Sequence, residues 1–329
     1  MKTRLFSVLV VLSLLTALTA AVLADAELPP AVNPFNAEND PKSVRIGGYR
    51  YEPVGFDQHT IFKYTGKPVS LTFRFVGTGS DTEVGVIFFL DGVLQPHTAS
   101  NAAGDTPVTI SRVRFDAEGS EEVTFTFTPV TGKKGDHLGL QMTSIFFPDF
   151  VPDDPEGSFT VFHSILSYVP LQFDMEADSA ASNRSFELNC AEVAIPDELR
   201  ERNTSPENPT GEFTSPRFDF FAGDDRFNND PIYTDGAETH ELTLQGYDGI
   251  EADYRVTFFL DNHPLEITGG QNAVIHVPYG KMTRCTVPLT LPAVRPLSPL
   301  TAALVPIGDS FLSEEAQCWL THPIKIALK

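Results

Sequence analysis

Apolar and polar side chains alternate with a period of two through most of this chain. Residues 69–75 read VSLTFRF and residues 123–127 read VTFTF, so every second side chain is valine, leucine or phenylalanine. Because successive side chains of a β-strand point to opposite faces, this alternation predicts strands with one buried face. Glycine, proline, asparagine and aspartate separate the runs about every ten residues, as turns between strands do.

A helical pattern is confined to one short segment outside the N-terminal region. In residues 195–203, IPDELRERN, Pro196 and the charged residues after it predict a single short helix. The pattern as a whole therefore predicts an all-β protein.

Several blocks of sequence recur in the same order in the two halves of the chain. Phe-Phe-Leu-Asp stands at 88–91 and again at 258–261. Three further pairs of blocks align: Tyr-Thr at 64–65 with 233–234, Leu-Thr at 71–72 with 242–243, and VTFTFTPV from Val123 with VPLTLPAV from Val287. Four blocks in one order predict two copies of a single domain with insertions in the loops.

The repeat sets the expected domain boundaries. We expect, in chain order, a signal peptide (1–26), a flexible arm (27–40), a first β-sandwich domain (41–175), a linker with one possible strand (176–217) and a second β-sandwich domain (218–329). The linker is rich in Ser, Asn, Glu and Pro, as segments between domains are. Its apolar middle, SFELNCAEVAI, is expected to form a strand on the second domain.

The strand that ends in FFLDG, the later VTFTFTPVTGKKGDHLGL and the tandem arrangement together resemble immunoglobulin-like repeats of bacterial secreted and surface proteins, including the cell-adhesion-related type. The resemblance covers most of residues 60–150 and, more weakly, 230–307. It implies two tandem immunoglobulin-like β-sandwich domains of seven or eight short strands each. The second copy departs from the pattern, because Asn262 replaces the turn glycine and the GKKGD turn is missing.

The doubled Phe-Phe-Leu-Asp block predicts a strand followed by a tight turn. Asp91-Gly92 suits the central positions of a hairpin turn, where φ is positive. Phe88 and Phe258 are expected to face the core, which turns Phe89 and Phe259 to the opposite face. There they either form an exposed apolar platform for a partner, or pack under loops or between the domains.

The N-terminal residues predict export, and the net charge suits a protein that stays in solution outside the cell. Lys2 and Arg4 precede an apolar run that ends near the small residues Ala24-Asp25-Ala26, as in a cleaved signal peptide; an uncleaved membrane anchor is the alternative. With 44 acidic and 23 basic residues the net charge is −21. Such a surface repels nucleic acid and anionic lipid. We expect a secreted or surface-associated protein without stable membrane insertion after cleavage.

Three cysteines, Cys190, Cys285 and Cys318, all lie in the second half of the chain. In an oxidising compartment one pair is expected to form a disulfide and to leave one cysteine over. The sequence does not decide which pair forms, although the linker strand is expected to bring Cys190 near Cys285 or Cys318.

Candidate chemical sites are few. Residues 223–236 gather Asp224, Asp225 and Asp230, which either hold calcium or form a solvated acidic turn. Apart from calcium, no cofactor is expected, since the eight histidines are scattered without zinc-ligand spacing. GDSF at 308–311 is similar to the Gly-Asp-Ser block of certain esterases, but only His322 follows it, so we expect no catalysis there.

These observations favour an exported, non-enzymatic protein for adhesion, extracellular scaffolding or protein–protein binding. The alternative is carbohydrate binding, for which Trp319, Tyr233 and Tyr247 would form the aromatic surface. A secreted hydrolase ranks third, because nothing selects one pair of carboxylates from the others. The expected partner is an extracellular protein or a glycan.

Overall fold

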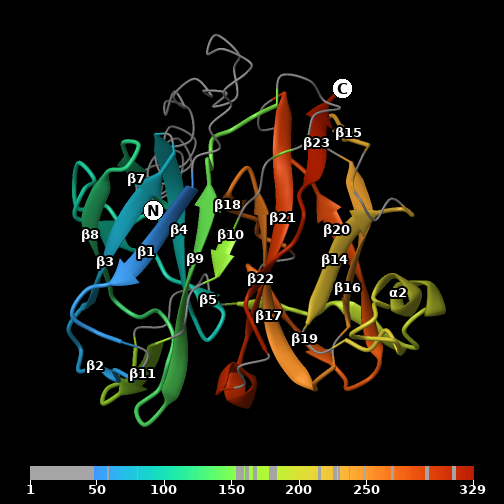
Figure 1. Cartoon of the computed structure of the whole chain (residues 1–329), viewed down its shortest axis with the longest axis horizontal. Helices are drawn as coiled ribbons and strands as arrows, with labels where there is room; N and C mark the ends of the chain where they lie inside the picture. Colours follow the sequence, from blue (N-terminus) through green and yellow to red (C-terminus); the bar gives the residue numbers. More distant parts are fainter. Residues whose placement is uncertain are drawn as a thin grey trace, which may run out of the picture. The chain divides into compact units, whose positions relative to one another are not determined.

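The computed structural model describes residues 48–329 apart from 58, 80, 153–158, 160–162, 166–168, 178–183, 214–215, 225–227, 229, 237, 248, 268–269, 293–295 and 313–315. The expected signal peptide and flexible arm lie outside the described residues. Within the described part of the chain, no helix has the length and apolar character needed to cross a membrane. The described elements are almost all strands, so the all-β prediction is confirmed (Figure 1).

The first half of the chain forms two sheets, which we call the first sandwich. Its strands are β1 (Gly48–Pro53), β2 (Phe62–Tyr64), β3 (Val69–Thr78), β4 (Thr82–Leu90), β5 (Val93–Leu94), β6 (Thr98–Ala99), β7 (Ser111–Phe115), β8 (Ser120–Phe127), β9 (His137–Phe146), β10 (His163–Ile165) and β11 (Val169–Phe173). One sheet has the order β1-β3-β8-β6, and the other has the order β2-β11-β9-β4-β5. These orders place strands as in the ABED and CFG sheets of an immunoglobulin-like sandwich.

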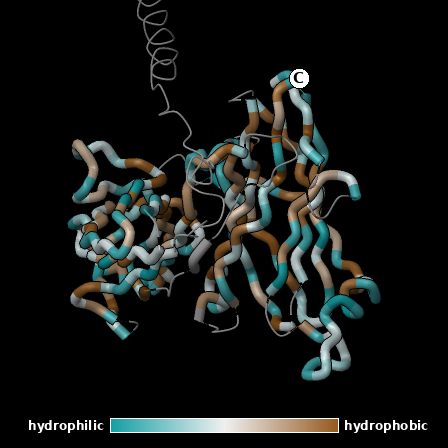
Figure 2. The backbone as a smooth tube through the Cα atoms, turned by 45° about the horizontal axis from the view of Figure 1, so that its top comes forward, coloured by the Kyte–Doolittle hydropathy of each residue, from teal (hydrophilic) through white to brown (hydrophobic). Residues whose placement is uncertain are grey.

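The alternation in the sequence determines which side chains fill this sandwich. Along β3 the buried residues Val69, Leu71, Phe73 and Phe75 alternate with more exposed ones. They meet Phe88 of β4 and Phe125 of β8, so both sheets contribute to one core. Figure 2 shows the resulting change between hydrophobic and hydrophilic positions along the strands.

The second half of the chain forms two further sheets, the second sandwich. Its elements are β12 (Ser185–Phe186), β13 (Asn189–Val193), α2 (Asp197–Arg202), β14 (Arg217–Ala222), β15 (Ile232–Thr234), β16 (Thr239–Tyr247), β17 (Ala252–Leu260), β18 (His263–Pro264), β19 (Asn272–Val277), β20 (Met282–Thr290), β21 (Leu297–Pro306), the 3-10 helix η2 (Gly308–Leu312), β22 (Trp319–Leu320) and β23 (Ile324–Leu328). The sheet orders are β13-β20-β16-β14 and β12-β19-β17-β21-β23-β15. Phe258 lies in the core between them.

The two sandwiches pair their strands in corresponding ways. β1 pairs with β3 and β3 with β8, as β14 pairs with β16 and β16 with β20. In each sandwich a three-residue strand, β2 or β15, runs parallel to the last strand, β11 or β23. The expected boundaries at residues 41, 175 and 218 stay a prediction.

The linker supplies two strands to the second sandwich. β12 pairs with β19 and β13 pairs with β20. β13 stands at the sheet edge that β6 occupies in the first sandwich, although β6 comes from within that sandwich's own sequence. The short helix expected after Pro196 is present as α2, in which Leu199 packs on Tyr247 and Met282.

Candidate functional site

Phe89 and Phe259 meet at the contact between the two sandwiches. Their side chains are 0% and 2% exposed, and their rings pack edge to face with centroids 6.4 Å apart. A cluster from both sandwiches surrounds them, which we call the interface cluster: Ile87, Phe89, Leu94 and Ile145 from the first, and Phe259, Ala303, Val305, Cys318 and Leu320 from the second. Phe89 and Phe259 are therefore not an exposed platform, because each is covered by the opposite sandwich.

The turn after each Phe-Phe-Leu-Asp block takes the predicted hairpin form. Asp91 and Gly92 have φ of 48° and 73°, and Asp261 and Asn262 have φ of 53° and 62°. Two-residue turns with positive φ at both positions match the twist of antiparallel strands. Gly92 and Asn262 both tolerate this conformation, so the departure from glycine in the second copy does not change the turn.

Each turn also binds the opposite sandwich, which the sequence did not indicate. The backbone oxygen of Asp91 accepts a hydrogen bond from Nε of Arg255 (2.8 Å), and its carboxylate lies 3.3 Å from Nη2 of Arg255. The other carboxylate oxygen accepts from the backbone N–H of Gly308 (3.2 Å). On the opposite side, the amide of Asn262 donates to the backbone oxygen of Pro148. Asp91 therefore joins the sandwiches as well as forming a turn.

The ion pair between Asp91 and Arg255 is partly shielded from water. The two side chains are 21% and 16% exposed, and Arg255 also donates to Oδ1 of Asn272 (3.1 Å). A pair held by several hydrogen bonds loses less entropy on ordering than an isolated surface pair does. Arg255 thus fixes the position of the first sandwich's turn against β17 and β19.

Gly92 leaves room for Arg255, and this gives a testable prediction. A Cβ on Gly92 would lie 2.5 Å from the Cβ of Arg255, in addition to the strain of a side chain at φ 73°. Gly280 has a similar φ of 67° but open space around it, so it is a matched control. We expect Gly280→Ala to lower the free energy of unfolding by about 1 kcal/mol and Gly92→Ala by about 2–4 kcal/mol. Urea unfolding measures both losses, and equal losses would show that the Arg255 contact is unimportant.

Cys318 is the free cysteine of the described chain. It lies in the interface cluster and is 3% exposed. Burial raises the pKa of its thiol to about 12, because the thiolate loses its hydration there. The thiol is therefore protonated and shielded while the two sandwiches stay in contact.

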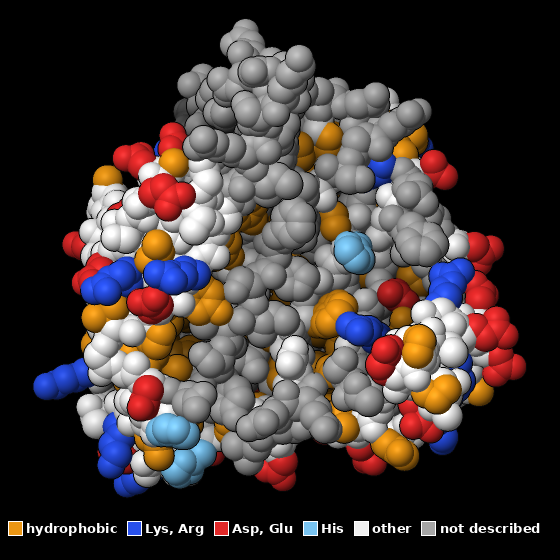
Figure 3. Space-filling view, viewed as in Figure 1, with side chains coloured by type: hydrophobic (Ala, Val, Ile, Leu, Met, Phe, Trp, Pro, Cys, Tyr) orange, Lys and Arg blue, Asp and Glu red, His pale blue; other side chains and the backbone are white. Residues whose placement is uncertain are grey.

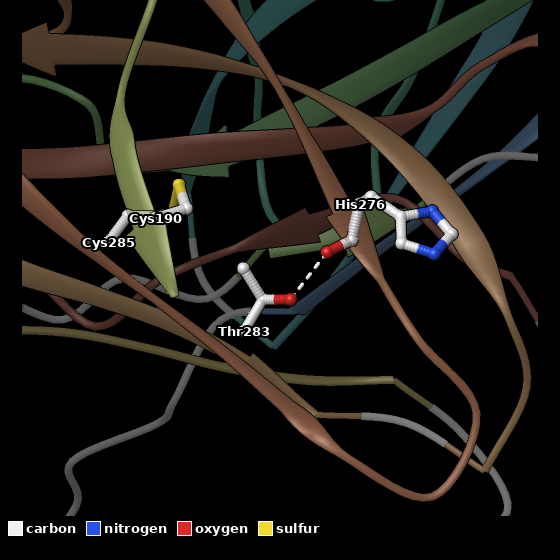
Figure 4. The surroundings of a disulfide bond; sticks show 4 residues. All are labelled: Cys190, His276, Thr283 and Cys285. Atoms are coloured by element: carbon white, nitrogen blue, oxygen red, sulfur yellow. Dashed lines mark hydrogen bonds between the residues drawn. A yellow bond between two sulfur atoms is a disulfide. The ribbon is translucent and has the colours of Figure 1, made fainter. Parts of the chain in front are cut away.

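The other two cysteines form a disulfide. Cys190 on β13 and Cys285 on β20 are direct partners in the register of the two strands (Figure 4). Cys285 is 1% exposed and belongs to the core of the second sandwich, whereas Cys190 is exposed. The bond therefore links a core residue to the outermost strand of the sheet.

The three aromatic residues of the carbohydrate alternative do not form one surface. Tyr247 is 6% exposed and packs beside α2, while Trp319 is half-buried against Phe218 with the guanidinium of Arg217 over its ring. Tyr233 is exposed on β15. Trp319 and Tyr247 therefore do not lie together on an exposed aromatic face, and a binding role for Trp319 stays a prediction.

The acidic segment has no metal-binding geometry in its described part. Asp224 and Asp230 are exposed, and Asp225 lies outside the described residues. Among the described residues, no group of three or more His, Cys, Asp or Glu side chains is placed to hold a metal ion. Figure 3 shows acidic and basic side chains spread over one face, with hydrophobic ones scattered between them.

Ser310 of the GDSF block takes part in a hydrogen bond with the backbone of a neighbouring strand. Its hydroxyl oxygen accepts a hydrogen bond from the backbone N–H of Asp253 (3.0 Å). The carboxylate of Asp253 lies 2.8 Å from Nδ1 of His276, and Glu251 lies 3.7 Å from the Nε2 of the same ring. Because these side chains are about half exposed, the contacts around His276 contribute little to stability.

His97 is a buried histidine that the sequence pattern does not single out. It is 0% exposed, and its ring packs against the rings of Phe88 and Phe125. Its Nδ1–H donates a hydrogen bond to the backbone oxygen of Gln95 (3.0 Å). Nε2 has no hydrogen-bond partner among the described residues. Burial lowers the pKa of His97 to about 4, because the imidazolium would lose its hydration. His97 is therefore a neutral core residue.

Among the strands whose burial the structure describes, β13 is exposed along its whole length, and it lies at the edge of its sheet. All five of its residues are exposed, and among the described strands its one partner in the sheet order is β20. Glu192 of β13 forms an exposed ion pair with Lys281 (3.0 Å). An edge strand presents backbone N–H and C=O groups to which a further strand can bind.

Comparisons with known proteins give no family. No protein-family model matches the sequence, and no curated protein matches it. Among solved structures, the chain is similar to the periplasmic chaperone SfaE (10% identity, 85% of this chain and 100% of that chain, TM-score 0.22). It is also similar to the E. coli chaperone DraB (10% identity, 87% and 98%, TM-score 0.23) and to the Pseudomonas aeruginosa CupB2 chaperone (8%, 83% and 100%, TM-score 0.22). At these TM-scores the likeness says nothing about binding, and the fold described above rests on the strand pairing.

Proposed function

We propose that this is an exported, non-enzymatic protein that binds an extracellular protein partner through the edge strand β13. The observation that carries the proposal is the exposure of all five β13 side chains on a strand at the end of its sheet. A partner strand added there would gain backbone hydrogen bonds from the edge and specificity from the side chains beside it.

The contact between the two sandwiches supports this choice of surface. The aromatic side chains that would otherwise attract a partner, Phe89 and Phe259, are covered by each other. The Asp91–Arg255 contact holds the two sandwiches together as a support for the edge. A rigid support lowers the entropy cost of ordering the binding surface when a partner binds. Adhesion and scaffolding are the biological settings that such a binding protein serves.

Site-specific cross-linking tests the proposal. A photoreactive amino acid placed at Ala191, in the middle of β13, should cross-link the native partner in the secreted fraction of the source cells. The matched control places the same group at Lys134, which is exposed on a turn of the first sandwich. The proposal predicts a partner cross-linked from position 191 and absent from position 134. Equal cross-linking from both positions would contradict it.

A further inference from the structure

We infer that the Cys190–Cys285 disulfide is a reducible clamp that holds β13 on the sheet, and that a dithiol reductant releases this strand. The observation is that the two cysteines differ in burial. Cys285 lies in the core with Val287 and Leu289 on the inner face of β20, whereas Cys190 is exposed on the edge strand. Because Cys190 is an exposed residue at the edge of the sheet, a thiolate can approach the disulfide from that edge.

β13 has few other attachments. None of its five side chains is buried, so the strand contributes no apolar side chain to the core. It is held by backbone pairing over five residues and by the exposed Glu192–Lys281 ion pair. The disulfide is therefore the main attachment between the side chains of β13 and the sandwich.

The rest of the second sandwich is held independently of β13. β20 pairs with β16 over nine residues, from Met282–Tyr247 to Thr290–Thr239. Thr283 also donates from its hydroxyl to the backbone oxygen of His276 on β19 (Figure 4). After reduction, Cys285 remains a small apolar side chain in the core. Release of β13 therefore leaves the core and the neighbouring strands in place.

A dithiol supplies the two electrons that reduction of this disulfide requires. One thiolate of the dithiol attacks the sulfur of Cys190, forms a mixed disulfide and releases Cys285, which takes up a proton. The second thiol of the reductant then attacks the mixed disulfide and releases Cys190 as a thiol. Two electrons pass to the protein disulfide, and the dithiol ends as a disulfide.

Hydrogen exchange of the full mature chain tests the clamp, with dithiothreitol as the dithiol. After reduction, the amides of residues 189–193 should exchange at least tenfold faster, while those of β16 and β17 keep their protection. Cys318→Ser, treated in the same way, is the control that removes the remaining thiol. Cys190→Ser should show the fast exchange without reductant. Reoxidation of the wild-type chain should restore the slow exchange.

Two results would overturn the clamp. Unchanged exchange at 189–193 would mean that backbone pairing alone holds the strand. Equal loss of protection in β13, β16 and β17 would mean that the bond stabilises the whole sandwich. Strand release is independent of the proposed function, and only its effect on partner binding rests on it. If reduction frees β13 and cross-linking from position 191 persists unchanged, the clamp stands and the proposed binding edge is wrong.

Discussion

Replacing Phe89 by alanine is expected to lower the free energy of unfolding by about 3–5 kcal/mol, the usual cost of deleting a fully buried phenyl ring. Phe89 is 0% exposed and lies against Phe259, so the deletion leaves a cavity between the sandwiches. Phe88→Ala should cost a similar amount, but its cavity lies inside the first sandwich. Equilibrium unfolding in urea measures both losses.

The buried thiol of Cys318 distinguishes the two variants. In Phe89→Ala the interface should open without unfolding either sandwich, so a thiol reagent should label Cys318 at a rate that depends little on urea. In Phe88→Ala labelling requires the first sandwich to unfold, and its rate should rise steeply with urea. If both variants show the same steep dependence, the interface does not open separately from the sandwiches.

Acidification is expected to destabilise the protein through His97. The folded state holds the pKa of His97 at about 4, while the unfolded chain has the ordinary value near 6.5. Between these values the unfolded state binds a proton that the folded state does not. The contribution of His97 to the free energy of unfolding is therefore fully present above about pH 6.5 and is lost as the pH falls towards 4. The difference corresponds to about 3–4 kcal/mol at ~1.4 kcal/mol per pKa unit.

The contribution of His97 is measured as a difference between variants, because many carboxylates also titrate in this range. Urea unfolding of the wild-type chain and of His97→Phe should be compared at pH 7.0, 5.5 and 4.5. His97→Phe loses the bond to Gln95 and should be less stable at pH 7.0, but its stability should fall less on acidification. His137→Gln, at an exposed position, is the control for removing a histidine. Parallel curves for wild type and His97→Phe would refute the prediction.

Local features of the fold were predictable because their causes lie within a few residues. The alternating runs at 69–75 and 123–127 became β3 and β8, and the Asp91-Gly92 pair became a tight turn. Pro196 begins the short helix in both the sequence pattern and the structure. In each case the local structure follows from the alternation of apolar side chains or from the backbone conformation that a residue favours.

The candidate site was harder to predict, because it depends on which sheets face each other. Arg255 and Asp91 are 164 residues apart, and nothing local to either indicates the contact. One signal was present in the sequence. Residues 86–90, VIFFL, are continuously apolar, unlike the alternating run at 69–75. A continuous run is typical of a strand buried on both faces, and it distinguishes the covered side of β4 from the exposed side of β3.

The origin of β13 in the linker also has a consequence for the order in which the protein can fold. Cys190 precedes its partner by 95 residues, and β13 is made before any strand of the sheet it joins. The described strands of the first sandwich contain no cysteine and are complete before that point. The first sandwich can therefore fold during synthesis, while the second cannot close its edge until β20 has followed. Covalent closure of this edge is a late event in the maturation of the chain.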